Sequence, residues 1–227
     1  KGLNLLLNEQ QDKAIDAFIE AVQNDPDTTE LHFALGNLFR RRGEFERAVR
    51  VHQHLLGRAD LKAGDRDRAQ LALAQDFMKA GLFDRAEAAW HALEGTPFDG
   101  EARLALLSLY ERSRDWRRAV EVARVLDRAG GGSFASRIAH YECEIAEEAE
   151  AQGRTEDAEA ALQRARKAAP SAPRPLALTG QRFLRQAQPA LALAAWDTLR
   201  ERHPAAFLLV AGDYAAALVM ETAKIGR

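Results

Sequence analysis

HFALGNLFRRRGEFERAVRVHQHLL spans residues 32–56 and has the pattern of two helices joined by a short turn. A small residue, Gly36, is followed twelve positions later by Ala48 and four positions after that by His52. Two antiparallel helices cross closely only where one presents a small side chain to the other, while apolar residues at helical spacing fill the groove between them. The polar turn RRGE separates the two helices. The stretch therefore predicts a helical hairpin.

The same triplet recurs along the whole chain. Its alanines are Ala14, Ala48, Ala86, Ala119, Ala158 and Ala192, spaced by 34, 38, 33, 39 and 34 residues. A period of about 34 residues, with one helical hairpin in each unit, is that of tetratricopeptide repeats. One hairpin cannot bury its own apolar face, so the units must stack on their neighbours. We therefore predict an all-α, right-handed superhelical solenoid of about six tetratricopeptide repeats and a terminal helix.

The period also sets the expected boundaries within a single repeat domain over residues 1–227. The stretches ADLKAGDRD and RAGGGSFASR lengthen two of the connections, which we expect to be loops. The triple glycine at 130–132 follows no strand and precedes no Gly-Lys-Ser/Thr, so it does not indicate a phosphate site. The predicted repeats cover residues 1–28 (partial), 29–62, 67–100, 100–133, 139–172 and 173–206, and the terminal helix covers 207–225.

Composition narrows the functional classes. The chain has 227 residues, 47% of them apolar, and 32 basic residues against 34 acidic ones. A net charge of -2 lacks the cationic excess that binds phosphate backbones, so we expect no nucleic-acid partner. A single cysteine, Cys143, excludes an internal disulfide framework and fits a reducing compartment. No run of about 18 apolar residues is evident. The start at Lys1 suggests a fragment of a longer protein.

No group of residues in the sequence suggests catalysis, and we expect no cofactor. His52 and His54 are two residues apart, so on a helix they point to different faces and cannot chelate one metal; His52 should fill a core position and His54 face solvent. His140, Cys143 and Glu147 share a face with ligand-like spacing but form an incomplete metal site. The run of acidic side chains on the same helix is interpreted as a solvated face, with members Glu142, Glu144, Glu147, Glu148 and Glu150.

A repeat array of this type binds partners on its concave surface, which positions two, five, nine, twelve and thirteen of each unit supply. In the N-terminal half these positions are basic with apolar interruptions, which suits a segment that carries carboxylates beside apolar anchors. The clamp that binds acidic chaperone C-termini is disfavoured, because Phe33 stands where that clamp needs lysine. The predicted groove residues are Phe33, Asn37, Arg40, Arg41, Leu71, Gln75, Met78, Lys79, Ser108, Arg112, His140, Gln181 and Arg185.

The motifs LGNLFRRR and RVHQ, together with DFMKAGLFDRAEAAW and IAHYECEIAEEA, resemble the LapB (YciM) family of lipopolysaccharide assembly proteins. The resemblance implies an adaptor at the cytoplasmic face of the bacterial inner membrane that promotes destruction of the deacetylase LpxC by the protease FtsH. It also implies an N-terminal membrane anchor and a C-terminal rubredoxin-like zinc module. Neither is recognisable here, so we expect a soluble repeat fragment. The part of the family's structure that the resemblance transfers to this chain is the repeat surface, which includes Asn37, Arg40, Arg41 and Arg42.

Two other functions remain open from the sequence. One is a generic scaffold for another envelope assembly, and the other is the regulatory repeat region of an enzyme such as an O-linked N-acetylglucosaminyl transferase. A transferase would need an α/β sugar-nucleotide domain, and no glycine-rich strand-to-helix turn is present. A homodimer is also plausible in each case, because Leu3, Leu6, Leu7 and the apolar last helix would otherwise meet water. LpxC and FtsH are the expected partners by resemblance, and we expect no catalytic activity.

Overall fold

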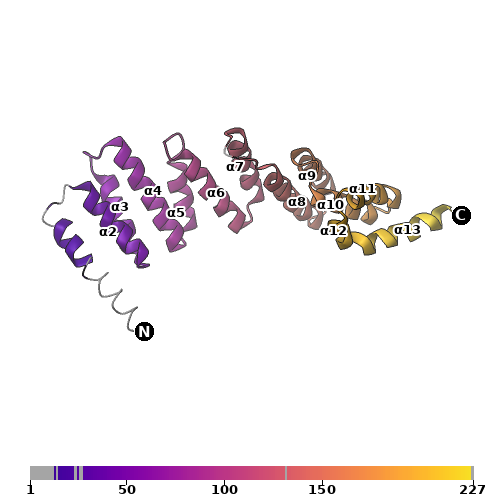
Figure 1. Cartoon of the computed structure of the whole chain (residues 1–227), viewed down its shortest axis with the longest axis horizontal. Coiled ribbons are helices and arrows are strands. Elements are labelled where there is room, and N and C mark those ends of the chain that lie inside the picture. The colour runs from indigo at the N-terminus through magenta and orange to yellow at the C-terminus, as the bar shows by residue number, and fades with distance from the viewer. Residues whose placement is uncertain (1–12, 14, 23–24, 26–27, 131, 226–227) are drawn as a thin grey trace, which may run out of the picture. The chain divides into compact units, whose positions relative to one another are not determined.

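The computed structural model describes residues 13, 15–22, 25, 28–130 and 132–225. Predictions that concern Leu3, Leu6, Leu7 and most of the first repeat lie outside these residues. The described chain is helical with no strand, which confirms the predicted all-α class of tetratricopeptide hairpins (Figure 1). It divides into two compact units, residues 1–109 and 110–227.

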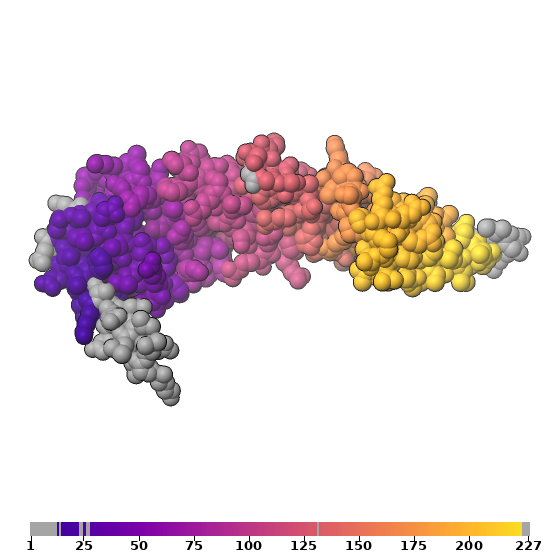
Figure 2. Space-filling view, in the orientation of Figure 1, coloured from indigo at the N-terminus to yellow at the C-terminus, as the bar shows by residue number. Residues whose placement is uncertain are grey.

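Within the described residues, the first unit contains two complete hairpins. Helix α2 (Thr29–Arg41) packs on α3 (Phe45–Gly57), α3 packs on α4 (Ala63–Ala80), and α4 packs on α5 (Phe83–His91). Helix α6 (Asp99–Ser113) then crosses into the second unit. The predicted loop ADLKAGDRD is shorter than expected, because α4 begins at Ala63 and takes up its second half. Side chains fill the spaces between neighbouring ribbons of each unit (Figure 2).

The second unit continues the pattern from the end of α6. Helix α8 packs on both α7 and α9, α10 packs on α11, and α13 packs on α11. The connection predicted at RAGGGSFASR lies between α7 and α8 but is shorter than expected, because α7 includes Arg128 and α8 begins at Ala135. The predicted terminal helix corresponds to α13, which ends at Ile225 and begins at Ala211, after a short helix and a 3-10 turn. The bounds are α7 (Trp116–Arg128), α8 (Ala135–Ala151), α9 (Thr155–Ala168), α10 (Pro173–Arg185), α11 (Pro189–Arg202), α12 (Pro204–Phe207), η1 (Leu208–Val210) and α13 (Ala211–Ile225).

Small residues lie where the helices of each hairpin cross. A Cβ atom added to Gly36 would lie 2.4 Å from His52 Nε2, and one added to Gly180 would lie 2.2 Å from Trp196 Nε1. His52 is fully buried and His54 is exposed, as the sequence predicted. The alanines of the recurring triplet are buried throughout the described part of the chain, at positions Ala48, Ala86, Ala119, Ala158 and Ala192.

Five turns between the paired helices share one backbone geometry. In each, one residue has a positive φ between 56° and 79°, and the next residue donates its N–H to the carbonyl five positions earlier. The donor and acceptor pairs are Glu44 and Phe39, Leu82 and Phe77, Asp115 and Tyr110, Arg154 and Ala149, and Gln188 and Phe183, at 2.8–2.9 Å. This bond satisfies a carbonyl that the helix end would otherwise leave unpaired.

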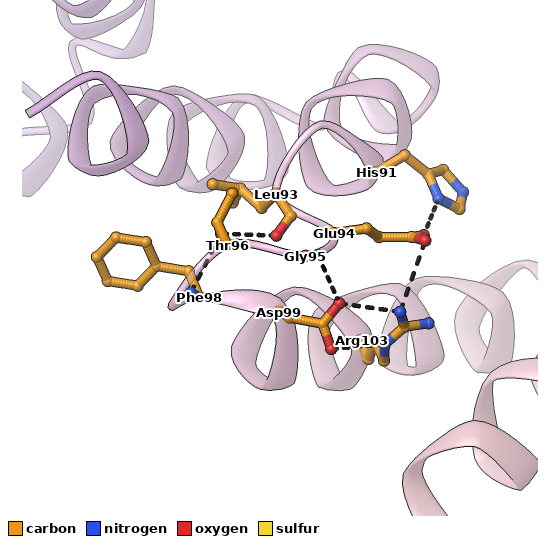
Figure 3. A network of polar contacts seen from close by, with 8 residues as sticks. All are labelled: His91, Leu93, Glu94, Gly95, Thr96, Phe98, Asp99 and Arg103. Atoms are coloured by element: carbon orange, nitrogen blue, oxygen red, sulfur yellow. Dashed lines mark hydrogen bonds and ion pairs between the residues drawn. The ribbon is translucent and has the colours of Figure 1, made fainter. Parts of the chain in front are cut away.

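The connection from α5 to α6 is held by polar side chains (Figure 3). Asp99 Oδ1 accepts from the backbone N–H of Gly95 at 3.0 Å, and the same carboxylate accepts from Arg103 Nε at 2.8 Å. Glu94 Oε1 lies 2.6 Å from His91 Nδ1, and Glu94 Oε2 lies 3.6 Å from Arg103. The hydrogen bond from Arg103 lowers the pKa of Asp99. The loop is therefore fixed at both of its ends.

The predicted solvated acidic face on α8 is wrong in part. Glu142 is 1% exposed, and its carboxylate accepts from Arg124 Nη2 at 2.9 Å and from Arg164 Nε at 2.9 Å. A buried carboxylate is tolerated only when it is paired and hydrogen-bonded, and arginines from the helices on either side meet that requirement. Glu142 therefore links α7, α8 and α9.

One stretch of the described chain, Pro204–Ala223, is long and apolar enough to cross a membrane by length and composition. The sequence reading did not find it. Leu208 and Leu209 within it are 74% and 86% exposed. Helices that do not cross a membrane can pass the same test, so length and composition do not identify this stretch as a membrane span.

The crossing at Gly36 can be tested by adding a single methyl group. Gly36→Ala should lower the free energy of unfolding by about 1–3 kcal/mol, because its Cβ would clash with a fully buried ring. Gly64→Ala is the matched control, since its added Cβ would meet no atom within 4 Å apart from its chain neighbours and the backbone of its own helix. This change should leave stability unchanged or raise it by about 0.5–1 kcal/mol. Urea unfolding followed by circular dichroism measures both, and equal effects would contradict the packing argument.

Candidate partner-binding groove

A groove of about 320 Å³ lies in the first unit, between α2 and α4. Five of the predicted residues line it, namely Phe33, Asn37, Arg40, Leu71 and Gln75. The sequence did not predict the other three lining residues, Arg68, Ala72 and Phe98. Arg68 holds position two of the predicted repeat 67–100, so the repeat register could have identified it. Phe98 belongs to the connection before α6, where the register gives no indication.

The apolar part of the groove comes from residues that the helices hold firmly. Phe33 is 5% exposed and belongs to the core of the first hairpins, together with Leu55, Leu61 and Ala69. The guanidinium of Arg68 lies 4.4 Å from the centre of the Phe33 ring. A cation placed over an aromatic ring in this way is attracted to it. The groove therefore has an apolar floor with a cation beside it.

Arg40 is tied to a buried carboxylate. Its Nη1 donates to Asp76 Oδ1 and to the carbonyl of Ala72, both at 2.9 Å, and its Nη2 donates to Asn37 Oδ1 at 2.5 Å. Asp76 is fully buried, and its other oxygen lies 2.5 Å from His52 Nδ1. Arg40 thus connects α2 to α4 while one edge of it faces the groove.

The groove is less basic than the sequence predicted. Arg68 pairs with Glu30 at 2.7 Å and with Asp65 at 3.1 Å, and its hydrogen bond lowers the pKa of Glu30. Gln75 Nε2 donates to Glu101 Oε1 at 3.1 Å. Both arginines that line the groove are therefore already neutralised by carboxylates of the chain itself. The physical reason is that a residue count does not show which charges are paired.

The remaining predicted residues lie elsewhere. Arg41 and Lys79 are exposed at the ends of α2 and α4, where Met78 is half-buried; Ser108 and Arg112 are exposed on α6. Gln181 and Arg185 line a separate opening of about 370 Å³ in the second unit, beside Glu147 and Glu150. Gln181 donates to Asp213 at 3.3 Å. Glu147 and Glu150 supply acidic side chains to the lining of this opening, and Gln181 and Arg185 supply other polar ones. Leu178 is the larger of its apolar lining residues.

The side chains considered as metal ligands on α8 have other roles. His140 Nδ1 lies 2.6 Å from Arg174 Nη1, and Glu147 pairs with the same arginine at 2.5 Å. Cys143 is fully buried, and burial raises the pKa of its thiol to about 12. Within the described residues, no group of three or more His, Cys, Asp or Glu side chains could hold a metal ion.

The contacts of Arg40 predict that the fold requires this arginine and not the neighbouring Arg41. Arg40→Ala should lower the free energy of unfolding by about 3 kcal/mol, because it leaves the Asp76 carboxylate buried without its guanidinium partner. Arg41→Ala, one position along and exposed, should change it by less than about 0.5 kcal/mol. Thermal and urea unfolding of both variants measure the difference. Similar values for the two would show that the Asp76 pair contributes little.

The burial of Cys143 predicts that its thiol reacts slowly with reagents in solution. Its raised pKa leaves little thiolate at neutral pH, and the folded chain shields the sulfur. A soluble aromatic disulfide reagent should therefore react with the folded protein far more slowly than with the same protein in concentrated denaturant. Equal rates in the two conditions would contradict the burial of this side chain.

Comparison with known proteins agrees with the repeat assignment. Residues 31–67 and 71–134 each match the family described as Tetratricopeptide repeat. Lipopolysaccharide assembly protein B of Escherichia coli K12 is 43% identical over 146 residues, which are 64% of this chain and 38% of that protein. The protein of the same name from Haemophilus influenzae is 31% identical over 212 residues, 89% of this chain and 53% of that protein.

The matches span about half or less of the length of these relatives. A solved tetratricopeptide repeat protein from Parabacteroides merdae is 15% identical with a TM-score of 0.45, over 86% of this chain and 73% of that one. The repeats and the relatives point to a protein-interaction module rather than to an enzyme. The chain thus carries tetratricopeptide repeats and is similar to lipopolysaccharide assembly protein B, in line with the resemblance seen in its sequence.

Proposed function

We propose that this chain is the partner-binding part of an adaptor that regulates lipopolysaccharide synthesis by promoting FtsH-dependent proteolysis of LpxC. The similarity to lipopolysaccharide assembly protein B supports the process, and the repeats support an adaptor that acts by binding. The adaptor would act at the cytoplasmic face of the bacterial inner membrane. LpxC and FtsH are its proposed protein partners.

The groove in the first unit is the observation that carries the proposal. It combines an apolar floor with two side-chain amides, Asn37 and Gln75, in about 320 Å³. Asn37 Oδ1 already accepts a hydrogen bond from Arg40, and Gln75 Nε2 already donates one to Glu101. The Asn37 nitrogen is therefore left to donate and the Gln75 oxygen to accept. A segment with an apolar side chain and a backbone C=O and N–H within reach fits this arrangement.

The neutralised arginines refine the kind of segment expected. Arg40 and Arg68 each face carboxylates of the chain itself, so a ligand carboxylate would have to compete with Asp76, Glu30 or Asp65. An apolar side chain of the partner does not compete with these carboxylates. The groove is therefore proposed to select its partner by apolar fit and backbone hydrogen bonds, with charge in a secondary role.

Leu71→Glu tests this proposal without touching the buried ion pair. A carboxylate in the apolar part of the groove should weaken binding of purified LpxC, or of the cytoplasmic part of FtsH, by about tenfold or more, because the anchor loses its apolar contact. Surface plasmon resonance on the immobilised chain measures the affinity. Leu191→Glu is the matched control, since Leu191 is 49% exposed and lies outside the groove.

Unfolding curves accompany both variants, so that a loss of binding can be separated from a loss of structure. Saturable binding that Leu71→Glu weakens and Leu191→Glu preserves supports the proposal. Binding that both variants retain moves the site away from the groove. If neither partner binds this chain or a longer form of the protein that includes it, the proposed role in lipopolysaccharide synthesis is wrong.

A further inference from the structure

Two of the five equivalent turns lack glycine at their positive-φ position, and one of these two carries arginine there. Three turns place glycine there, at Gly43, Gly81 and Gly153. Arg114 holds that position between α6 and α7 with a φ of 56°, and Ala187 holds it between α10 and α11 with the same value. A side chain in this conformation costs about 1 kcal/mol, so nothing in the turn geometry favours arginine.

The turn with Arg114 is also the most basic of the five. Residues 112–118 read RSRDWRR, with four arginines against one aspartate and a net charge of +3. The corresponding seven residues of the other turns, at 41–47, 79–85, 151–157 and 185–191, carry net charges between -1 and +1. The charge therefore belongs to this turn and is not a feature of the repeat.

Part of this charge is not neutralised within the chain. Asp115 accepts from Arg118 Nε at 2.6 Å and from the backbone N–H of Arg118 at 3.2 Å, so its carboxylate is engaged by Arg118. Arg114 and Arg117 are exposed, and no carboxylate in the described part of the chain lies within 4.0 Å of either guanidinium. These two arginines are therefore available to an anionic partner, unlike the arginines of the groove.

An aromatic side chain lies in the same turn. Trp116 is half-buried, with its ring stacked 5.9 Å from that of Tyr141. The other two tryptophans, Trp90 and Trp196, are 3% and 0% exposed. Tryptophan and arginine are the residue types most enriched where protein interfaces gain their binding energy. The turn thus combines an exposed cationic edge with a rigid, partly accessible ring.

We propose that the turn at residues 112–118, which joins α6 to α7 (Figure 1), binds an acidic segment of a partner protein that carries apolar side chains. The segment's carboxylates pair with Arg114 and Arg117, whose planar guanidinium groups suit carboxylates, and its apolar side chains contact Trp116. Nucleic acid fits less well, because two unpaired arginines on a chain with a net charge of -2 supply too few phosphate contacts. The site does not depend on the groove, which lies in the first unit.

Peptide binding to the full chain tests the proposal. The probe is a fluorescein-labelled peptide of alternating glutamate and leucine, and a peptide with lysine in place of glutamate is its counterpart. Anisotropy should show saturable binding of the glutamate peptide that weakens as salt rises. Added peptide should also protect tryptophan fluorescence from a soluble quencher, and this signal reports on Trp116 because the other two tryptophans are buried.

The variant Arg114→Gly with Arg117→Glu should weaken binding of the glutamate peptide about tenfold and abolish the protection of Trp116. Its unfolding temperature should be unchanged or higher, because glycine relieves the positive φ. The control combines Ala187→Gly, which places glycine at the equivalent positive-φ position, with Arg50→Glu, which reverses the charge of an exposed arginine elsewhere. The control should bind within about twofold of the original chain.

Three results would overturn the proposal. They are equal binding of the glutamate and lysine peptides, equal weakening by the test and control variants, and binding that leaves Trp116 open to the quencher. None of them bears on the groove, because Leu71→Glu and the turn variant change different units. Loss of LpxC or FtsH binding in Leu71→Glu alone would leave the turn proposal intact.

Discussion

The close crossing of paired helices at a small residue is the constraint on which the rest of this structure depends. At Gly36 and Gly180 the facing ring lies where a Cβ atom would be, and the alanines of the recurring triplet are buried. Because the helices approach this closely, the rings of His52 and Trp196 are fully buried between them. Each hairpin then presents a single apolar face to the next, which is the physical basis of a repeat array.

Buried charges connect neighbouring helices in a second way. Asp76 is reached by Arg40 and by the ring of His52, Glu142 is reached by Arg124 and Arg164, and Arg182 donates to Glu150 at 2.8 Å. Each pair joins residues of different helices, so removing one partner would leave a charge buried in the interface between them. The desolvation of such pairs offsets much of their attraction, so their net contribution to stability is smaller than the loss that follows from removing one partner.

This use of charge separates the two surfaces proposed to bind partners. In the groove the arginines already serve the stacking of α2 on α4 or pair with carboxylates nearby, so recognition there depends on apolar contact and amide hydrogen bonds. At the turn after α6, Arg114 and Arg117 pair with no carboxylate of the described part of the chain and face solvent. A chain with a net charge close to zero can therefore still present a local cationic site.

The sequence by itself determined the repeat, the helical class and the burial of the triplet, because a spacing of about 34 residues and the need for small residues at a crossing are local properties of the chain. It also placed His52 in the core and five residues on one groove. Only the tertiary structure decided which charges are free. Asp76 lies 36 residues from Arg40, and Glu142 lies 18 and 22 residues from its two arginines. Such pairs form only when separate repeats stack, so a count along the chain predicted a basic groove and a solvated acidic face where the fold instead pairs these groups.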